Sequence, residues 1–335
     1  MLGVAAIALA SCTQNEAMEV AESRAIGFDA FVGKTTKTVI DAEHPLTAFQ
    51  VYGGYVKTAD ATTATNLTNV WKNVAVSNTT GEWKAAGEPK YWAAGMTYQF
   101  AAYAPAGIVT EEDAIKVNTD NKNLNFTGVV ANVSTQNDFI YATANETTDD
   151  PLTASPEKIK FTFGHQLAMI KVTFNSKFTS EYKLTISDLE IYGMNSTADF
   201  TGSTKAWSNF KAPIAQGSGF KTIASADAQA KDEEPTTAKS GEFIVIPQTE
   251  GTMNVNFTAT AYDTNDTKVA SHKFTGTVTP KWSNGNVYNY TVEIAPEDFQ
   301  GGGEGEDDIF EIKFENPTVN PWVDADMEDN GNISF

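Results

Sequence analysis

The single cysteine of this chain is its residue best suited to covalent chemistry. Cys12 ends an apolar run and closes the sequence Leu9-Ala10-Ser11-Cys12. This is the pattern of a bacterial lipobox, in which small residues precede a thiol that receives a diacylglycerol. Residues 2–10 are too short for a membrane span, which needs about 20 apolar residues, but they suit the apolar region of a signal peptide. We therefore predict a signal peptide over residues 1–11 and a lipid on Cys12.

The alternative interpretation of Cys12 is a free thiol beside a buried apolar N-terminal segment. The basic residues that usually open a signal peptide are missing from the first residues, so we expect the natural start to lie upstream. Two acyl chains on one cysteine give stable membrane anchoring. Lipidation would place the protein at the outer membrane and the cell surface, which is the localisation we expect.

The composition favours an exported β-protein. A net charge of −20 over 335 residues argues against a nucleic-acid partner, because phosphate contacts need patches of Lys and Arg. One cysteine permits no internal disulfide, so buried apolar cores must provide the stability, and the length favours two domains. No later stretch has the length of a membrane helix.

Apolar residues alternate with polar ones along several segments, which indicates half-buried strands. The clearest such segments are 96–102, 158–163, 168–174, 255–259 and 288–294. Turn signals such as Gly53-Gly54 and Ser283-Asn284-Gly285 lie between strands. Long amphipathic helices are absent, and the Ala-rich residues 223–230 would form at most a short one. The pattern predicts an all-β fold of sandwiches with hairpin and Greek-key connections.

Two breaks in composition suggest how the chain is divided. Residues 147–157 contain two prolines and two adjacent acids, which suits a connection between domains, although a long loop within one domain would look similar. We predict an N-terminal sandwich over 25–155 and a C-terminal sandwich over 156–299. Residues 300–308 form an acidic, glycine-rich linker, so 300–335 are expected to be a linker followed by terminal strands.

A strand pattern follows that linker. Phe310, Ile312 and Phe314 alternate with Glu311 and Lys313, which predicts a strand with one apolar face. Such a strand needs a partner sheet.

Several further motifs occur in order along nearly the whole chain. They are the lipobox at Cys12, Ile26-Gly27-Phe28 followed by Lys34-Thr35-Thr36-Lys37, Tyr91-Trp92 leading into YQFAAYAP at 98–105, QNDFIYA at 136–142, FTFGHQLA at 161–168, Ile246-Pro247-Gln248 and GNVYNYTV at 285–292. Together they resemble the fimbrillin family, the subunits of donor-strand-assembled type V pili of Gram-negative anaerobes. The resemblance implies two transthyretin-like β-sandwiches in tandem and other pilus subunits as partners.

The resemblance also implies a mechanism of assembly. In the family, the subunit is exported as a lipoprotein, an arginine-specific protease removes an N-terminal strand, and the C-terminal strand of another subunit fills the groove. An extended segment with alternating apolar side chains satisfies both an unpaired strand edge and an apolar slot. Phe310, Ile312 and Phe314 form the candidate donor strand, and residues 332–335 form a second one. The equal alternative is that the strand simply completes its own C-terminal sandwich.

Arg24 is the candidate processing site, and it is the only arginine in the chain. It precedes Ala25 in an acidic segment where a protease would find it accessible. Residues 13–23 have little strand character, however, and the alternative is that their removal opens no groove. An uncleaved chain would stay tethered to its lipid, as suits an anchor or minor subunit. The alternative is that Arg24 is an ordinary solvated surface residue.

No catalytic or metal-binding motif stands out. The three histidines His44, His165 and His272 are scattered, and we interpret His165 as a packing or hydrogen-bonding residue because zinc would need several partners. The acid pairs Asp149-Asp150 and Asp307-Asp308 lack the loop of a calcium site. Paired carboxylates for glycoside cleavage leave no sequence signature. We expect no cofactor, no metal and no enzymatic activity.

The six tryptophans allow a second hypothesis. Exposed rings would form a sugar-stacking platform, whereas buried rings would fill the ends of sandwiches. Two functions therefore remain. The first is a pilus subunit, anchor or tip component that acts in adhesion through strand complementation. The alternative is a monomeric surface lipoprotein that binds glycans or host ligands.

Overall fold

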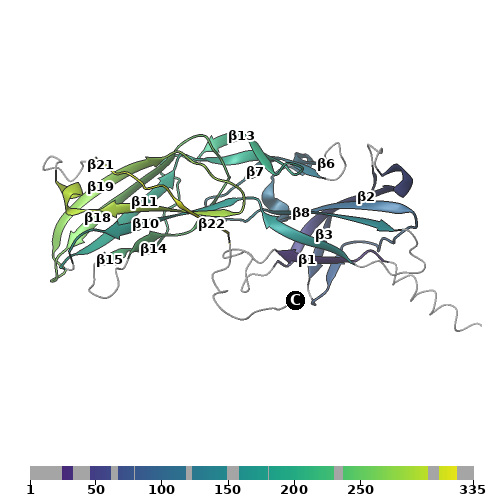
Figure 1. Ribbon diagram of the computed structural model, residues 1–335, viewed down its shortest axis with the longest axis horizontal. Coiled ribbons are helices and arrows are strands. Elements are labelled where there is room, and N and C mark those ends of the chain that lie inside the picture. Colours follow the sequence, from purple (N-terminus) through teal and green to yellow (C-terminus); the bar gives the residue numbers. More distant parts are fainter. Residues whose placement is uncertain are drawn as a thin grey trace, which may run out of the picture.

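The protein is an elongated all-β molecule (Figure 1). The structure, a computed structural model, describes residues 25–32, 46–61, 67–78, 80–117, 123–148, 158–179, 181–229, 237–300 and 309–322. Strands from the first part of the chain gather at one end of the molecule, and those from the second part at the other (Figure 1). The helices in these ranges are short 3-10 turns, and none has the length or hydropathy of a membrane span. They are η1 (Thr58–Asp60), η2 (Ala106–Ile108), η3 (Glu112–Ala114) and η4 (Pro296–Phe299).

A seven-stranded sheet forms the N-terminal end of the molecule. In spatial order its strands are β1 (Phe28–Val32), β9 (Ile159–His165), β8 (Ile140–Thr148), β5 (Met96–Ala104), β2 (Ala48–Lys57), β3 (Thr68–Asn78) and β4 (Trp83–Ala85). β1 runs parallel to β9, and the other neighbours are antiparallel. The sheet curls until its two ends nearly meet, because Ala25 forms an isolated bridge with Tyr91 beyond β4.

Aromatic rings fill the inside of this curl. The ring of Phe28 on the edge strand β1 lies 5.7 Å from Trp71, 6.0 Å from Phe100 and 6.0 Å from Phe161. Phe161 lies on the neighbouring strand β9, whereas Trp71 and Phe100 lie on β3 and β5, farther round the sheet. The first hydrophobic core is therefore enclosed by one sheet, as in a barrel.

A four-stranded sheet covers the outer face of the curled sheet. Its strands in order are β13 (Ala206–Pro213), β12 (Asn195–Thr201), β7 (Leu124–Val130) and β6 (Ile115–Val117). The second core lies between the two sheets and includes Tyr103, Phe126, Phe139 and Phe200. The edge strand β13 is irregular, because Asn209 and Ala212 have positive φ angles of 53° and 52° and its register against β12 shifts.

Two further sheets form the C-terminal sandwich. One contains β14 (Ile223–Ser225), β16 (Ala238–Ser240), β10 (Ala168–Ser176), β20 (Asn286–Ile294) and β22 (Thr318–Pro321), with β17 (Phe243–Val245) also paired to β10. The other contains β15 (Asp227–Gln229), β11 (Lys183–Tyr192), β18 (Met253–Tyr262), β19 (Lys268–Val278) and β21 (Ile309–Glu311). The third core lies between them.

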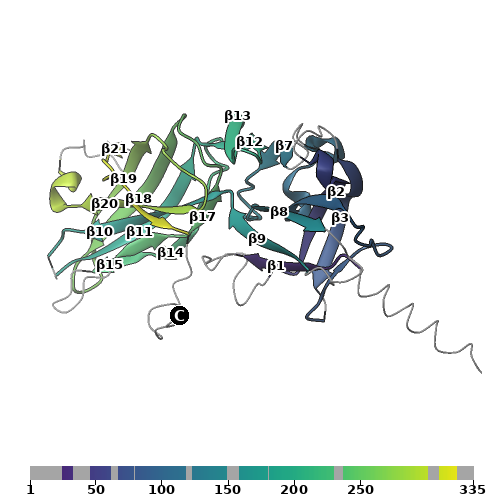
Figure 2. The same ribbon diagram turned by 45° about the vertical axis from the view of Figure 1, so that its right-hand side comes forward.

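Strand pairing crosses the predicted boundary at residues 155 and 156 in two places. β9 follows the boundary but pairs with β8 and β1 of the seven-stranded sheet. β12 also follows it, and it pairs with β7 from the first part of the chain; Figure 2 shows β7, β12 and β13 together at the junction. The division into domains at that point stays a prediction, as does the transthyretin-like type of the sandwiches.

The predicted all-β fold is confirmed. Along β9 the apolar residues Ile159, Phe161 and Phe163 are buried while Lys160 and Thr162 are exposed, which is the period of two that the sequence predicts. Residues 223–230, for which the sequence allows at most a short helix, carry the short strands β14 and β15 up to Gln229. Each is a three-residue strand on a sheet edge, where backbone pairing outweighs the helix preference of alanine.

Candidate functional site

The C-terminal residues 309–322, which we call the strap, lie across the open side of the C-terminal sandwich. The strap begins on one sheet, where β21 pairs with β19, and ends on the other sheet, where β22 pairs with β20. Figure 1 shows it in yellow, crossing from the far end of the sandwich toward the junction with the seven-stranded sheet. The strap therefore covers an edge of each sheet.

The first part of the strap carries the predicted donor residues. β21 is parallel to β19, with Phe310 opposite Phe274, and the Phe310 ring lies 4.7 Å from the His272 ring. Ile312 is buried in the third core, and Phe310 and Phe314 pack against that core. A backbone hydrogen bond also holds Ile312 on β19, because the Ile312 N–H donates to the Thr275 carbonyl at 2.8 Å. In this structure the strand fills a slot in its own sandwich.

Gly276 makes that slot deep enough for Phe314. A Cβ on Gly276 would lie 2.4 Å from Cε2 of Phe314 and 2.9 Å from the Ile312 carbonyl oxygen. Any other residue would collide with the ring or with the backbone. Glycine in β19 thus allows the strap to approach the sheet closely.

The strap then crosses from one sheet to the other. The Glu315 N–H donates to the Thr291 carbonyl of β20 at 3.1 Å. A half-open hollow of about 470 Å³ remains beneath the crossing, lined on one side by Tyr288 and Tyr290 and on another by strap residues 314–317 and Val319. Both tyrosine hydroxyls accept hydrogen bonds at 2.8 Å, from the Ser283 N–H and the Trp282 indole N–H respectively.

The last described residue of the strap is its most deeply buried. Trp322 retains 1% of its exposure and belongs to the second core. Its N–H donates to the Gly285 carbonyl at 2.9 Å. Its indole stacks on the His165 imidazole, with ring centres 4.6 Å apart and planes 14° apart.

His165 itself belongs to a buried polar pair. Its Nδ1 lies 2.6 Å from Oδ2 of Asp138, and the two side chains are 3% and 0% exposed. Within the described residues, neither His165 Nε2 nor Asp138 Oδ1 has a hydrogen-bond partner. The pair holds His165 in place beneath Trp322, in agreement with the hydrogen-bonding role expected for this histidine.

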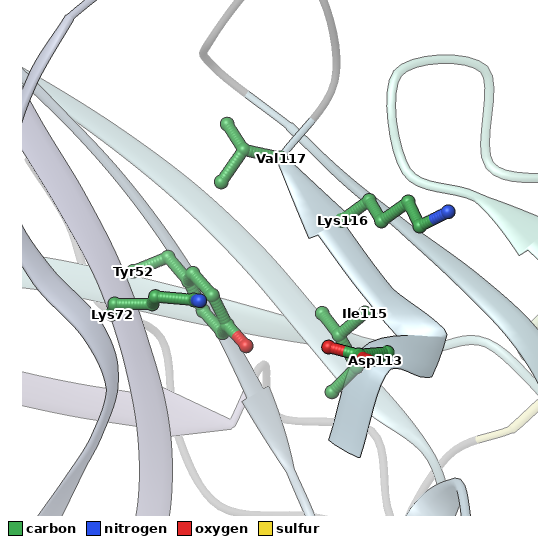
Figure 3. Close-up of a pocket in the computed structure, with 6 residues that line it drawn as sticks. All are labelled: Tyr52, Lys72, Asp113, Ile115, Lys116 and Val117. Carbon is green, nitrogen blue, oxygen red and sulfur yellow. The ribbon is translucent and has the colours of Figure 1, made fainter. Parts of the chain in front are cut away.

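A second hollow of about 430 Å³ lies between the curled sheet and β6 (Figure 3). Tyr52 and Lys72 come from β2 and β3, Asp113 comes from η3, and Lys116 comes from β6. The three charged side chains are exposed and carry both signs. The hollow therefore favours no particular class of ligand.

Several residues singled out in the sequence lie outside the described residues. These are Cys12, Arg24, His44, the acid pairs Asp149-Asp150 and Asp307-Asp308, and the second donor segment 332–335. The neighbourhood of Arg24 is nevertheless informative, because β1 begins after it with the buried residue Phe28. Cleavage at Arg24 would leave β1 in the mature chain.

The six tryptophans all lie in described segments, and none is exposed. Trp71, Trp92, Trp282 and Trp322 are buried, and Trp83 and Trp207 are half-buried against a core. The rings fill cores rather than form a platform for sugars. Across the described ranges, no three His, Cys, Asp or Glu side chains gather as a metal site would require.

Sequence reasoning missed three residues of the site. Trp322 stands apart from any alternating pattern, and Asp138 lies far from His165 in the chain, so neither contact has a local signal. Gly276 does have one, because an isolated glycine inside a strand pattern marks a bulge or the close approach of another backbone.

The fold and the strap define a class of structural β-protein in which a terminal strand completes a sandwich edge. The chain belongs to the fimbrillin-like family, whose model matches residues 36–322. This is a family of fimbrial structural proteins rather than of enzymes.

A solved structure with a TM-score above 0.5 shares this fold. A fimbrial protein from Bacteroides vulgatus has a TM-score of 0.60 at 15% identity, with 90% of this chain and 100% of that chain covered. The fimbrial anchor protein Mfa2 from Porphyromonas gingivalis matches with a TM-score of 0.36 and 9% identity, over 88% of this chain and 97% of that chain. No curated protein sequence matches the chain.

Proposed function

We propose that the protein is a fimbrial subunit or fimbrial anchor that acts in adhesion and joins other subunits by exchanging its strap. The observation that carries this proposal is the strap slot, which holds Phe310, Ile312 and Phe314 by edge pairing and by side-chain burial together. Membership of the fimbrillin-like family supports the role at the cell surface.

The slot that holds the strap within one chain can hold the strap of another. Exchange of an identical element keeps every contact of the closed form, so its cost is low. The alternative acceptor would be a groove left by an N-terminal strand removed at Arg24. β1 follows Arg24 and stays packed on β9, which favours the strap slot as the acceptor.

A crosslinking experiment tests exchange directly. Lys273 and Ile309 are opposite each other across β19 and β21, and both side chains are exposed. With Cys12→Ser as background, the double variant Lys273→Cys/Ile309→Cys should form a disulfide within one chain. When the two single variants are mixed and incubated, exchange should give a disulfide-linked dimer.

The matched control pairs Ile309→Cys with Ser208→Cys, a change on the exposed strand β13. This mixture should stay monomeric on a non-reducing gel. Exchange through this slot is excluded if the double variant crosslinks fully and the mixed single variants give no more dimer than the control does. Polymers in which the cysteines at 273 and 309 stay unlinked would show that subunits join at an edge other than β19. That result would also contradict the proposal.

We also propose that Cys12 carries the lipid and that the mature chain attaches to the outer membrane through it. The support is the lipobox pattern and the predicted signal peptide. Mass spectrometry of the mature N-terminus in cells tests this. A start at acylated Cys12 indicates a tethered anchor or minor subunit, and a start at Ala25 indicates processing at Arg24. An unmodified thiol would contradict the anchor.

A further inference from the structure

The burial of Trp322 contrasts with the exposure of the strand before it. All four residues of β22 are exposed, and Val319 retains 50% of its accessible surface. β22 is therefore held on β20 by its backbone, while Trp322 alone in this part of the strap buries a large side chain.

Trp322 enters a core to which both ends of the molecule contribute. The second core contains Phe139 and Tyr141 from the seven-stranded sheet side, and Met169 and Ile244 from the C-terminal sandwich side. The backbone connects the same parts, because the Gly285 N–H donates to the Leu167 carbonyl at 2.8 Å while the Gly285 carbonyl accepts from Trp322. The strap thus ends at the chain segment that joins β9 to β10.

From this geometry we infer that Trp322 is a latch for the strap and for the junction beneath it. While the indole occupies the core, β22 covers residues 286–289 of β20, and no other strand can add to that edge. When the indole leaves, the strap loses the buried side chain that directly follows β22, and the β20 edge and the junction open together. The latch is an autoinhibitory contact that keeps the subunit closed.

The polar pair beneath the indole makes the latch releasable. His165 Nε2 and Asp138 Oδ1 are buried without a hydrogen-bond partner among the described residues, which costs free energy in the closed state. Departure of Trp322 would uncover the face of the His165 ring on which it stacks and admit water there. Hydration of this buried polar side chain lowers the free energy of the open state and so opposes the loss of apolar burial. The closed and open states therefore lie closer in free energy than they would if only apolar side chains surrounded Trp322.

The role of this latch in assembly rests on the proposed function, whereas the latch itself can be measured in the isolated chain. Amide hydrogen exchange of the full chain compares Trp322→Ala with the control Val319→Ala, which alters the same segment at an exposed site. In Trp322→Ala, exchange should rise by about tenfold or more at 286–289, 318–322 and 166–167. The amides of β18, which does not pair with the strap, should change by less than about twofold.

A milder variant keeps the test decisive if Trp322→Ala unfolds the chain, which faster exchange in β18 would reveal. Trp322→Phe retains an apolar ring, and it should raise exchange at the same three segments by a smaller factor. The latch is wrong if Trp322→Ala in a folded chain, or Trp322→Phe, exchanges at these segments like Val319→Ala.

The crosslinking mixture separates this inference from the proposed function. Introducing Trp322→Ala into both single-cysteine variants should speed formation of the mixed disulfide if both ideas hold. Faster exchange of the strap with no mixed disulfide would keep the latch and reject assembly through this slot. If the mixed disulfide forms at the same rate with and without Trp322→Ala, strap exchange is supported. The latch is then rejected as the contact that limits this exchange.

Discussion

The ring of Phe314 packs directly over Gly276, at a position where a Cβ would lie 2.4 Å from the ring. The strap can reach the third core only because β19 carries no side chain at this point. The contact links a residue of the predicted donor strand to a glycine in the sheet on which it packs, and it allows the strap to lie close to β19.

Substitution of Gly276 should therefore destabilise the strap. We expect Gly276→Val to displace Phe314 and to lower the free energy of unfolding by about 1–3 kcal/mol, the usual cost of overpacking. Urea denaturation measures the loss, and proteolysis of residues 309–315 should become faster. Thr277→Val is the matched control at an exposed neighbouring residue. It should change neither the free energy of unfolding nor the rate of proteolysis. Equal behaviour of the two variants would contradict the close packing.

The edge strand β1 should contribute strongly to stability through Phe28. Its ring contacts Phe49, Trp71, Phe100 and Phe161 inside the curl, so Phe28→Ala should cost about 3–5 kcal/mol. Asp29→Ala removes a partly exposed partner of Lys158 at 3.7 Å and should cost at most about 1 kcal/mol. If chemical denaturation gives similar losses for both variants, β1 does not close the core.

Buried tyrosines predict a loss of stability in alkali. Burial raises the pKa of Tyr103 above its ordinary value, and the neighbouring Tyr52 adds to the shift; burial also raises the pKa of Tyr98 and of Tyr290. The unfolded chain releases these protons near pH 10, whereas the folded chain retains them. Stability contributed by the three groups is therefore complete below about pH 10 and falls as the pH rises further.

Melting temperatures measured between about pH 9 and pH 11.5 test this trend against the ordinary tyrosine pKa. Tyr103→Phe should flatten the decline, although it also loses the hydrogen bond of 2.9 Å to Asn73 Oδ1. Tyr91→Phe, at an exposed site, is the control and should leave the slope unchanged. An equal slope in all three proteins would show that Tyr103 ionises normally in the folded state.

The buried pair of Asp138 and His165 should be sensitive to the loss of either partner. Asp138→Ala removes the acceptor of the 2.6 Å contact and should cost about 1–3 kcal/mol, since a buried donor is left without a partner. Asp138→Asn keeps an acceptor oxygen and should recover part of this loss. Asp113→Ala on the exposed turn η3 should stay within about 0.5 kcal/mol. No difference between the two alanine variants in urea midpoints would contradict the pairing.

The sequence predicts the strands of this fold better than it predicts their partners. Alternation marks β9, β10, β18 and β20 because a strand with one buried face needs a period of two. The pairing of β12 with β7, and the parallel pairing of β10 with β20, depend on contacts between distant segments and leave no local pattern. β14 and β15 are too short to show a period, so the sequence gives no strand signal there.

In the candidate site, too, the sequence predicts the strand but not the sheet with which it pairs. The alternation of Phe310, Ile312 and Phe314 predicts a strand that needs a sheet, but it does not distinguish the chain's own sheet from that of another subunit. In the structure, the strand packs on the chain's own C-terminal sandwich. Trp322 and His165 lie far apart in the sequence and meet only in the folded protein. The spacing of residues therefore could not have predicted this contact.

The irregular strand β13 limits the directions in which subunits can associate. Its two left-handed residues, Asn209 and Ala212, interrupt the row of backbone groups that a neighbouring molecule would need for continuous sheet extension. At the opposite edge of the same sheet, β6 offers only three residues. Edge-to-edge pairing of this sheet with a second molecule is thereby disfavoured, so any association of molecules must use other surfaces.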